Sequence, residues 1–120
     1  HHKSSGLLQR VNNSSILIGQ AESMTIEFLS GWVRKGQSPL CGNSVHTDRR
    51  FIRKEMPELE MFLHYRIIDV STIKGLAKYW YPSELPPEKK SAHLAMSDIK
   101  ESVEELKWFR ENIFKTKIDE

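Results

Sequence analysis

Two stretches of this chain share one pattern, a short apolar run that leads through small polar residues into a helical segment. Residues 40–42 predict a short strand, and residues 43–47 predict a loop. A helix is then expected to open at Asp48 and to run until Pro57, which cannot continue it. This order of strand, loop and helix constrains the fold more than any other feature of the sequence.

A second unit of the same kind follows. Residues 66–70, RIIDV, predict a strand that is buried, because its residues are mostly apolar and β-branched. Ser71 or Thr72 is expected to cap the next helix, and Pro82 is expected to end that helix near Tyr81. Strands that alternate with helices favour an α/β layer.

Helical segments outnumber the strands. Residues 20–33 and residues 94–115 carry apolar side chains every three or four positions, so each predicts an amphipathic helix. The apolar positions are Met24, Phe28, Leu29 and Trp32 in the first, and Ile99, Val103, Leu106, Phe109 and Ile113 in the second. Two short strands cannot organise about five helices, because a two-stranded sheet is barely stable. Further strands are therefore expected from an absent N-terminal segment or from another chain.

The aromatic run Tyr79, Trp80 and Tyr81 allows two interpretations. It could form a platform on which nucleic-acid bases stack. Helical spacing instead predicts that Ile73, Leu76 and Trp80 form a buried stripe, which leaves Tyr79 or Tyr81 as the exposed ring. Core packing is the favoured interpretation for most of these residues.

The composition excludes several classes of protein. A length of 120 residues with 38% hydrophobic residues suits one compact domain. The 18 basic and 16 acidic residues leave a net charge of +2, too small a surplus for broad nucleic-acid coating. No apolar run is long enough for a membrane span, and the first residues lack the order of a secretion signal. The single cysteine, Cys41, cannot form an intrachain disulfide and is expected to be a small core residue.

The segment HLAMSDI, residues 93–99, places a histidine five positions before an aspartate. Five residues advance a helix by about 500°, so two helical side chains at this spacing would lie roughly 140° apart. His93 is therefore expected before the helix start and Asp98 within its first two turns. The imidazole could then deprotonate water while the carboxylate holds a metal ion. The alternative is a surface histidine beside an aspartate that complements the helix dipole.

Asp48 presents a similar choice. It follows a predicted strand and the small-residue turn GNS, at the edge where α/β folds bind ligands, but it could equally cap a helix. Asp69, Ser71 and Thr72 at the end of the second strand could hold a phosphate, although capping is favoured there. No HExxH, paired CxxC or GxxxxGK motif occurs, so a zinc protease, a zinc module and a P-loop nucleotidase are unsupported.

Five motifs, read in order, resemble oligoribonuclease. They are SGL at residues 5–7, EFL at 27–29, GNSVHTDRRF at 42–51, HYRIIDVST at 64–72 and HLAMSDIKESVEEL at 93–106. The resemblance covers nearly the whole chain and implies an α/β fold similar to ribonuclease H, in the DEDDh branch of 3′ to 5′ exonucleases. It implies action on dinucleotides and short RNA by a homodimer. The predicted fold is a partial ribonuclease H-like exonuclease fold, a helix-rich C-terminal portion with two short strands.

The resemblance also implies a catalytic site. Asp48 and Asp98 match acids that help hold two divalent ions, Mg²⁺ or Mn²⁺. His93 matches the base that activates the attacking water.

A phosphate-binding site is implied in the same way. Ser44, Arg66 and Ser71 match residues that cap the 5′ phosphate of the substrate. Tyr65 and His2 match residues that join them from around the dimer interface. An arginine suits this role because a guanidinium binds phosphate through two parallel hydrogen bonds.

The chain departs from the family pattern in two places. Ser97 stands where the family usually has another aspartate, but the spacing from the histidine retains Asp98 as the ligand. The family's Asp-x-Glu strand would lie before the first residue, so residues 1–120 are expected to form a single incomplete exonuclease domain. Without those two acids, Asp48 and Asp98 should bind two cations poorly, and the isolated chain is expected to be inactive.

Two other functions remain open. A non-catalytic dimerising or phosphate-binding module would keep the surfaces around Tyr65 and Arg66 and modulate a full-length partner. A proofreading DNA exonuclease shares the histidine-to-acid spacing but has no need of HYRIIDVST. The motifs look more like those of animal-type members, which implies a mitochondrial or cytoplasmic location, and no membrane partner is expected.

Overall fold

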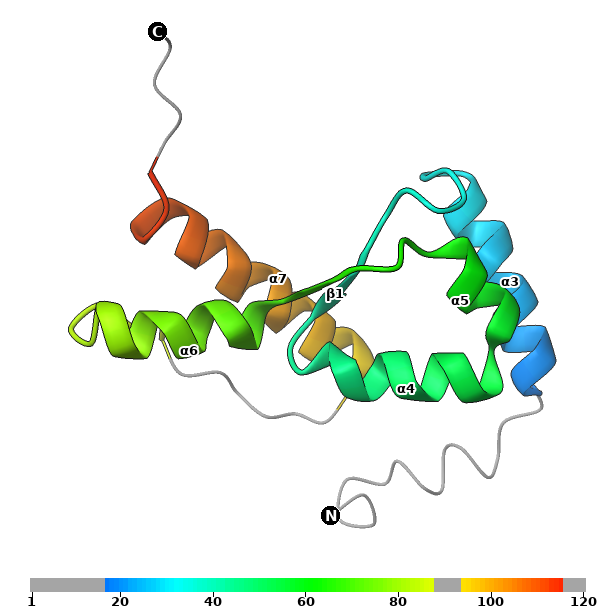
Figure 1. Cartoon of the computed structure of the whole chain (residues 1–120), viewed down its shortest axis with the longest axis horizontal. Helices are drawn as coiled ribbons and strands as arrows, with labels where there is room; N and C mark the ends of the chain where they lie inside the picture. Colours follow the sequence, from blue (N-terminus) through cyan, green and yellow to red (C-terminus); the bar gives the residue numbers. More distant parts are fainter. Residues whose placement is uncertain (1–16, 88–93, 116–120) are drawn as a thin grey trace, which may run out of the picture.

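The computed structural model describes residues 17–87 and 94–115 of the chain. Its elements are, in order, α3 (Ile18–Ser30), β1 (Leu40–Gly42), α4 (Val45–Glu55), α5 (Pro57–Phe62), β2 (Ile67–Asp69), α6 (Val70–Trp80) and α7 (Ala95–Asn112). The strands lie between two groups of helices, α6 with α7 at one end of the molecule and α3, α4 and α5 at the other (Figure 1). No described helix is both long enough and apolar enough to span a membrane.

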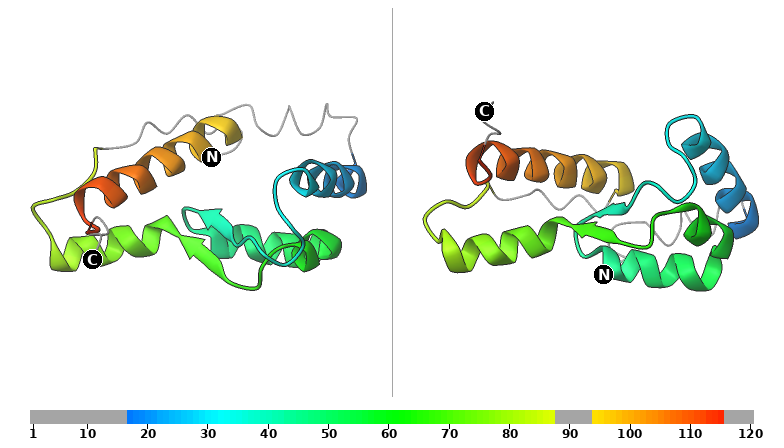
Figure 2. Two further views of the ribbon diagram at one scale, coloured as in Figure 1. Left: turned by 90° about the horizontal axis from the view of Figure 1, so that it is seen from above. Right: turned by 45° about the horizontal axis from the view of Figure 1, so that its top comes forward.

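The two strands form a parallel sheet, in which Leu40 lies opposite Ile67 and Gly42 lies opposite Asp69. The carboxyl ends of both strands are therefore neighbours, and α4 and α6 begin close to them. Helix α7 packs on β1 and on α6, and Figure 2 shows it running over one face of the strand pair. The predicted α/β order and the predicted first strand are confirmed.

The main hydrophobic core lies between α6 and α7. Phe109 is fully buried, and Val70 and Ala77 are 1% and 2% exposed. The partly buried side chains around them are Ile73, Leu106, Trp108 and Ile113. The second half of the predicted apolar stripe on α7 is thus packed, whereas Ile99 and Val103 in its first half are exposed.

A buried carboxylate joins α3 to α5 at the other end of the molecule. Glu22 is only 9% exposed, and its Oε2 accepts hydrogen bonds from the backbone amides of Glu58 at 2.8 Å and Leu59 at 3.0 Å. These amides lie in the first turn of α5, where a helix offers them no acceptor of its own. Glu22 therefore caps α5 from a neighbouring helix, an arrangement that the sequence did not indicate.

Several apolar side chains on the predicted amphipathic faces are exposed. Phe28 on α3 is 66% exposed and Trp32, which lies beyond the end of α3 at Ser30, is 77% exposed. On α6 Leu76 and Trp80 are 41% and 65% exposed, so the prediction that they form a buried stripe is wrong. An amphipathic face is buried only where another layer covers it, and the two short strands are too small to provide that layer for α3 or for the outer side of α6.

The strands themselves are also less buried than predicted. Ile67 and Ile68 point to opposite faces of the sheet, and they are 38% and 45% exposed. Cys41 of β1 is exposed as well, so its prediction as a core residue is wrong. With only two strands described, neither face of the sheet is covered along its whole width.

Two helix starts differ from the predictions. Helix α4 begins at Val45 with Ser44 as its N-cap residue, so Asp48 lies within the first turn and does not open the helix. Helix α6 is capped by Asp69 and not by Ser71 or Thr72. An aspartate that directly precedes a helix can accept a hydrogen bond from the first free amides, and this geometry is the one formed here.

The predicted helix ends agree better with the structure. Helix α6 ends at Trp80 beside Tyr81, as predicted. Helix α4 ends just before Pro57, and that proline begins α5, which the sequence did not separately predict. Proline suits the first position of a helix because that position needs no hydrogen-bonded amide.

Candidate functional site

The carboxyl ends of β1 and β2 meet at the carboxylate of Asp69. Its Oδ1 accepts hydrogen bonds from the backbone amides of Ser44 at 2.9 Å and Ser71 at 3.0 Å. The first amide lies at the start of α4 and the second at the start of α6. One oxygen therefore satisfies donors of two different helices and ties their first turns together.

The turn between β1 and α4 has a constrained backbone. Ser44 adopts a left-handed conformation, with φ 55° and ψ 42°, which residues other than glycine rarely occupy. Gly42 cannot carry a side chain without a shift, because a Cβ there would lie 2.8 Å from Cγ1 of Val45. The close approach at Gly42 and the left-handed Ser44 shape a turn in which the Ser44 hydroxyl lies beside Ser71 at the start of α6.

Four polar side chains form a hydrogen-bonded chain across this edge of the sheet. The hydroxyls of Ser44 and Ser71 are 3.4 Å apart. The Ser71 hydroxyl donates to Oδ1 of Asn43 at 2.8 Å, and Nδ2 of Asn43 donates to the Ser102 hydroxyl of α7 at 2.9 Å. The structure thus brings together Ser44 and Ser71, two of the predicted phosphate-binding residues.

Tyr65 and Arg66 form a separate group before β2. The guanidinium carbon of Arg66 lies 5.2 Å from the centre of the Tyr65 ring, which stacks on the His64 ring at 4.5 Å between centroids. In the described part of the chain, no hydrogen bond joins either side chain to Ser44 or Ser71. Arg66 precedes β2 whereas Ser71 follows it, so the strand separates the two groups.

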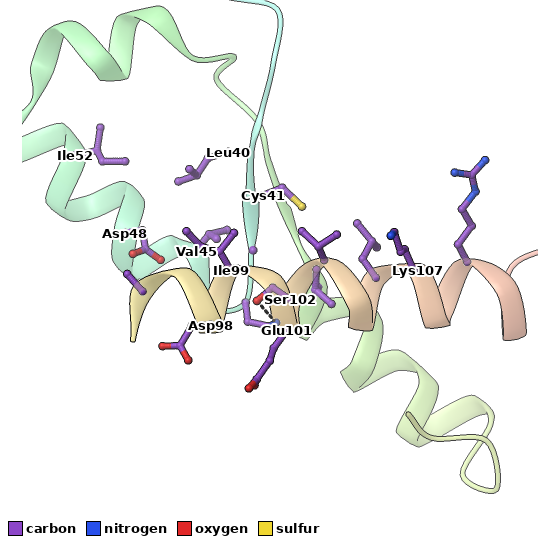
Figure 3. Close-up of a pocket in the computed structure, with 17 residues that line it drawn as sticks. Leu40, Cys41, Val45, Asp48, Ile52, Asp98, Ile99, Glu101, Ser102 and Lys107 are labelled. Atoms are coloured by element: carbon purple, nitrogen blue, oxygen red, sulfur yellow. Dashed lines mark hydrogen bonds between the residues drawn. The ribbon is translucent and has the colours of Figure 1, made fainter. Parts of the chain in front are cut away.

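A pocket of about 870 Å³ lies beside the turn that contains Asn43, between α4, β1 and α7 (Figure 3). Asp48 of α4 and Asp98 of α7 both line it. The Asp98 amide donates to the Leu94 carbonyl at 2.9 Å, which places Asp98 in the first turn of α7, as predicted. In Figure 3 the Asp98 carboxylate points away from Asp48, on the other side of the α7 ribbon.

The donor set around the pocket does not fit two metal ions by itself. Among the residues that the structure describes, no group of three or more histidine, cysteine, aspartate or glutamate side chains could hold a metal ion. Divalent ions such as Mg²⁺ need several oxygen ligands in a tight geometry, and two diverging carboxylates do not supply it. The predicted base His93 and the predicted phosphate-binding residue His2 lie outside the described residues.

Cys41 lines the same pocket but is not set up as a nucleophile. Although Cys41 is exposed, partial desolvation of its thiol raises the pKa of that group, and the negative charge of Asp69 raises it further. Both effects disfavour the thiolate, which is the reactive form and the metal-binding form of cysteine.

Comparison with known families identifies the domain. Residues 1–106 match RNase_T, the model of an exonuclease family. The chain belongs to the RNase_T exonuclease family. Its domain is accordingly a ribonuclease H-like exonuclease domain, and the described residues of it are helix-rich α/β with a short parallel sheet of two strands. Exonucleases of this family generally use divalent metal ions.

Curated relatives of this RNase_T chain are named oligoribonucleases. The oligoribonuclease of Hydrogenovibrio crunogenus is 55% identical over 115 residues, which are 95% of this chain and 62% of that protein. That of Vibrio campbellii is also 55% identical, over 95% of this chain and 64% of its own length. The probable oligoribonuclease of Dictyostelium discoideum is 52% identical, over 96% of this chain and 60% of its own length. The predicted resemblance is confirmed, and the chain spans less than two thirds of the length of these relatives.

Two residues of the site, Asn43 and Ser102, were not assigned from the sequence of this RNase_T chain. Asp69 was named there with Ser71 and Thr72 as a group that could hold a phosphate or cap a helix, but its bond to the Ser44 amide was not expected. Asp69 directly precedes a helix, which is a signal for an N-cap, and Asn43 lies inside the GNS motif. Ser102 follows Asp98 by one helical turn, so the two share a face of α7. The contact between Asn43 and Ser102 joins residues 59 positions apart, which no local pattern reveals.

Proposed function

We propose that this chain is part of a 3′ to 5′ exoribonuclease that hydrolyses dinucleotides and short oligoribonucleotides. The observation that carries the proposal is the convergence of the Ser44 and Ser71 hydroxyls, 3.4 Å apart, beside a pocket lined by Asp48 and Asp98. Hydroxyls at the starts of two helices suit a phosphate, and acids nearby suit the cleavage of a phosphodiester. The names of the relatives support RNA as the substrate.

The serine pair is proposed to bind the 5′ phosphate of the substrate. Arg66 would contribute a bidentate contact, and Tyr65 and His2 would join around the interface of a homodimer. Tyr65 and Arg66 precede β2 whereas Ser71 follows it, and this separation supports a contribution from a second subunit. A terminal phosphate held in this way would favour short substrates, because a longer RNA would have to pass through the cap.

The proposed metal ligands are Asp48 and Asp98, with Mg²⁺ or Mn²⁺ as the ions, and His93 is the proposed base for the attacking water. Because the described donors do not complete a metal site, further acids must come from outside them. We propose that residues 1–120 form one incomplete exonuclease domain whose sheet is extended by further strands. The open two-stranded sheet supports this reading.

Binding of RNA dinucleotides tests the phosphate site. The 120-residue chain should bind a 5′-phosphorylated dinucleotide more tightly than the same dinucleotide with a 5′ hydroxyl, and Ser44→Ala should remove most of that difference. Ser30→Ala is a matched control, because Ser30 bonds only to the backbone of its own helix. Equal affinity for the two dinucleotides in isothermal titration would contradict the proposed phosphate site.

Turnover tests the catalytic proposal. Incubated with a 5′-phosphorylated dinucleotide and Mn²⁺, the isolated chain should show no robust hydrolysis. Robust turnover that Asp98→Asn abolishes would overthrow the inactivity of the isolated chain. In any longer form of the protein that is active, full activity after His93→Ala would overthrow the role of His93 as the base.

A non-catalytic module is the second candidate, favoured by the exposed Tyr65 and Arg66. Tyr65 is 73% exposed, and its stack with Arg66 presents both side chains to solvent. Such a module would dimerise or associate with a full-length oligoribonuclease and alter its activity. Light scattering and titration with that enzyme decide the matter, and the absence of any association would remove this candidate.

A further inference from the structure

Asn43 connects the serine pair to helix α7. Its side-chain oxygen accepts from the Ser71 hydroxyl at 2.8 Å, and its side-chain nitrogen donates to the Ser102 hydroxyl at 2.9 Å. Asn43, Ser71 and Ser102 are all half-buried. The bond to Ser102, drawn as a dashed line in Figure 3, is therefore a direct polar link between the edge of the sheet and α7.

Ser102 lies on the same side of α7 as Asp98. The two residues are four positions apart, which is close to one helical turn, and both line the pocket. A single turn of helix moves as a rigid unit, so a displacement at Ser102 is transmitted to Asp98. The Asn43 bond to Ser102 thereby helps to set where the Asp98 carboxylate lies.

The single hydroxyl proton of Ser71 connects its bond with Asn43 to phosphate binding. A serine hydroxyl has one O–H group, and in this structure Ser71 gives it to Asn43. Ser71 can donate to a bound phosphate only by releasing Asn43. The freed Asn43 oxygen then lacks its donor, and reorientation of the amide to find another one changes its bond to Ser102.

We infer that Asn43 is a positioning residue that couples phosphate binding at Ser71 to the placement of Asp98. The inference rests on the proposed function, because it requires a phosphate at Ser71. If Asn43 only stabilised the turn between β1 and α4, a phosphate at Ser71 would leave α7 undisturbed.

Amide NMR spectra of the 120-residue chain, titrated with a 5′-phosphorylated RNA dinucleotide, test the coupling. The amides of Ser44 and Ser71 should shift, and those of Ser102 and Asp98 should shift at the same ligand concentrations. In Ser102→Ala the shift at Asp98 should be lost while the Ser44 and Ser71 amides still shift. Asn43→Ala should also lose the shift at Asp98, and it should bind the dinucleotide more tightly, because no acceptor then competes with the phosphate for the Ser71 hydroxyl. Ser102→Ala serves if Asn43→Ala does not fold. Ser30→Ala should match the unsubstituted chain.

The outcomes separate this inference from the proposed function. Shifts confined to Ser44 and Ser71 would overturn the coupling and leave the phosphate site intact. A shift at Asp98 that persists in Ser102→Ala would show direct contact with the ligand and would also overturn the coupling. No difference between the phosphorylated and the 5′-hydroxyl dinucleotide at any amide would overturn both.

Discussion

At Asp69 one carboxylate oxygen accepts hydrogen bonds from the backbone amides of Ser44 and Ser71, which lie at the starts of two helices. The second oxygen lies 4.0 Å from Nδ1 of His46, so this carboxylate also faces an imidazole on α4. Charged acceptors at the starts of helices stabilise them, because the free amides and the helix dipole both favour negative charge. A single residue thus sets the relative placement of both proposed phosphate-binding hydroxyls.

Gly42→Ala should destabilise the fold. Its new Cβ would lie 2.8 Å from Cγ1 of Val45, a side chain that is only 3% exposed and has little room to move. We expect a loss of about 1–3 kcal/mol in the free energy of unfolding, measured by urea denaturation. Gly75→Ala is the control, since a Cβ there meets no atom within 4 Å, and it should stabilise α6 by about 0.5–1 kcal/mol. Equal effects of the two substitutions would contradict the close approach at Gly42.

The Cys41 thiol should react slowly at neutral pH. Partial desolvation and the Asp69 charge both favour the protonated thiol and raise its pKa, so the thiolate forms only at higher pH. The rate of alkylation by iodoacetamide should have its midpoint above the value of about 8.5 typical of a free cysteine. Asp69→Asn should lower that midpoint, whereas Asp48→Asn should leave it unchanged. A midpoint below the typical value would contradict the assigned environment.

At the scale of elements, Glu22 shows how one helix can depend on another. Helix α5 has six residues and receives no side-chain cap from its own N-cap residue, Met56. A helix this short is marginal by itself. The Glu22 carboxylate of α3 supplies the missing acceptor for two amides of α5, so the two helices should form and unfold together.

The substitution Glu22→Ala should therefore lower the free energy of unfolding much more than substitutions at neighbouring positions on α3. It leaves the buried amide of Leu59 and the partly buried amide of Glu58 without an acceptor. The loss at a buried amide costs about 1–3 kcal/mol, and the loss at Glu58 should cost less. Urea denaturation measures the total, and hydrogen exchange should show the largest loss of protection in α5. Glu27→Gln on the exposed side of α3 should change stability by less than about 0.5 kcal/mol. A comparable effect at both glutamates would contradict the capping role.

Local sequence patterns predicted the elements well and their surroundings poorly. The strand at Leu40–Gly42, the end of α6 at Trp80 and the place of Asp98 in the first turn of α7 all depend on neighbours in the sequence. The bond from the Ser44 amide to Asp69 and the position of Ser102 beside Asn43 depend on tertiary contacts. Burial was the weakest prediction, because an apolar stripe such as that containing Phe28 cannot show whether a partner covers it.

The part of the molecule that the structure describes is thin and extended for its size. Its extents are 49 × 39 × 21 Å with a radius of gyration of 16.8 Å, whereas compact domains of this length have radii of about 12–14 Å. The largest cluster of buried side chains lies between α6 and α7, around Phe109, whereas α3 contributes no buried apolar side chain. Much of the stability should therefore reside away from α3.

The same substitution at two phenylalanines tests this distribution. Phe109→Ala should lower the free energy of unfolding by about 3–5 kcal/mol, because the side chain is fully buried. Phe28→Ala on α3, where the ring is 66% exposed, should lower it by less than about 1 kcal/mol. Dilute protein should be used, so that association does not bury Phe28. Similar losses would show that the outer face of α3 is packed in solution.

The left-handed backbone at Ser44 has a consequence for protein engineering. Glycine adopts this conformation without the steric penalty of a side chain, so a screen that rewards only thermal stability would select Ser44→Gly. That variant would lose the hydroxyl that we propose for phosphate binding, although its thermal stability would increase. Libraries built to stabilise this domain should hold position 44 fixed, because there heat resistance and ligand recognition favour different residues.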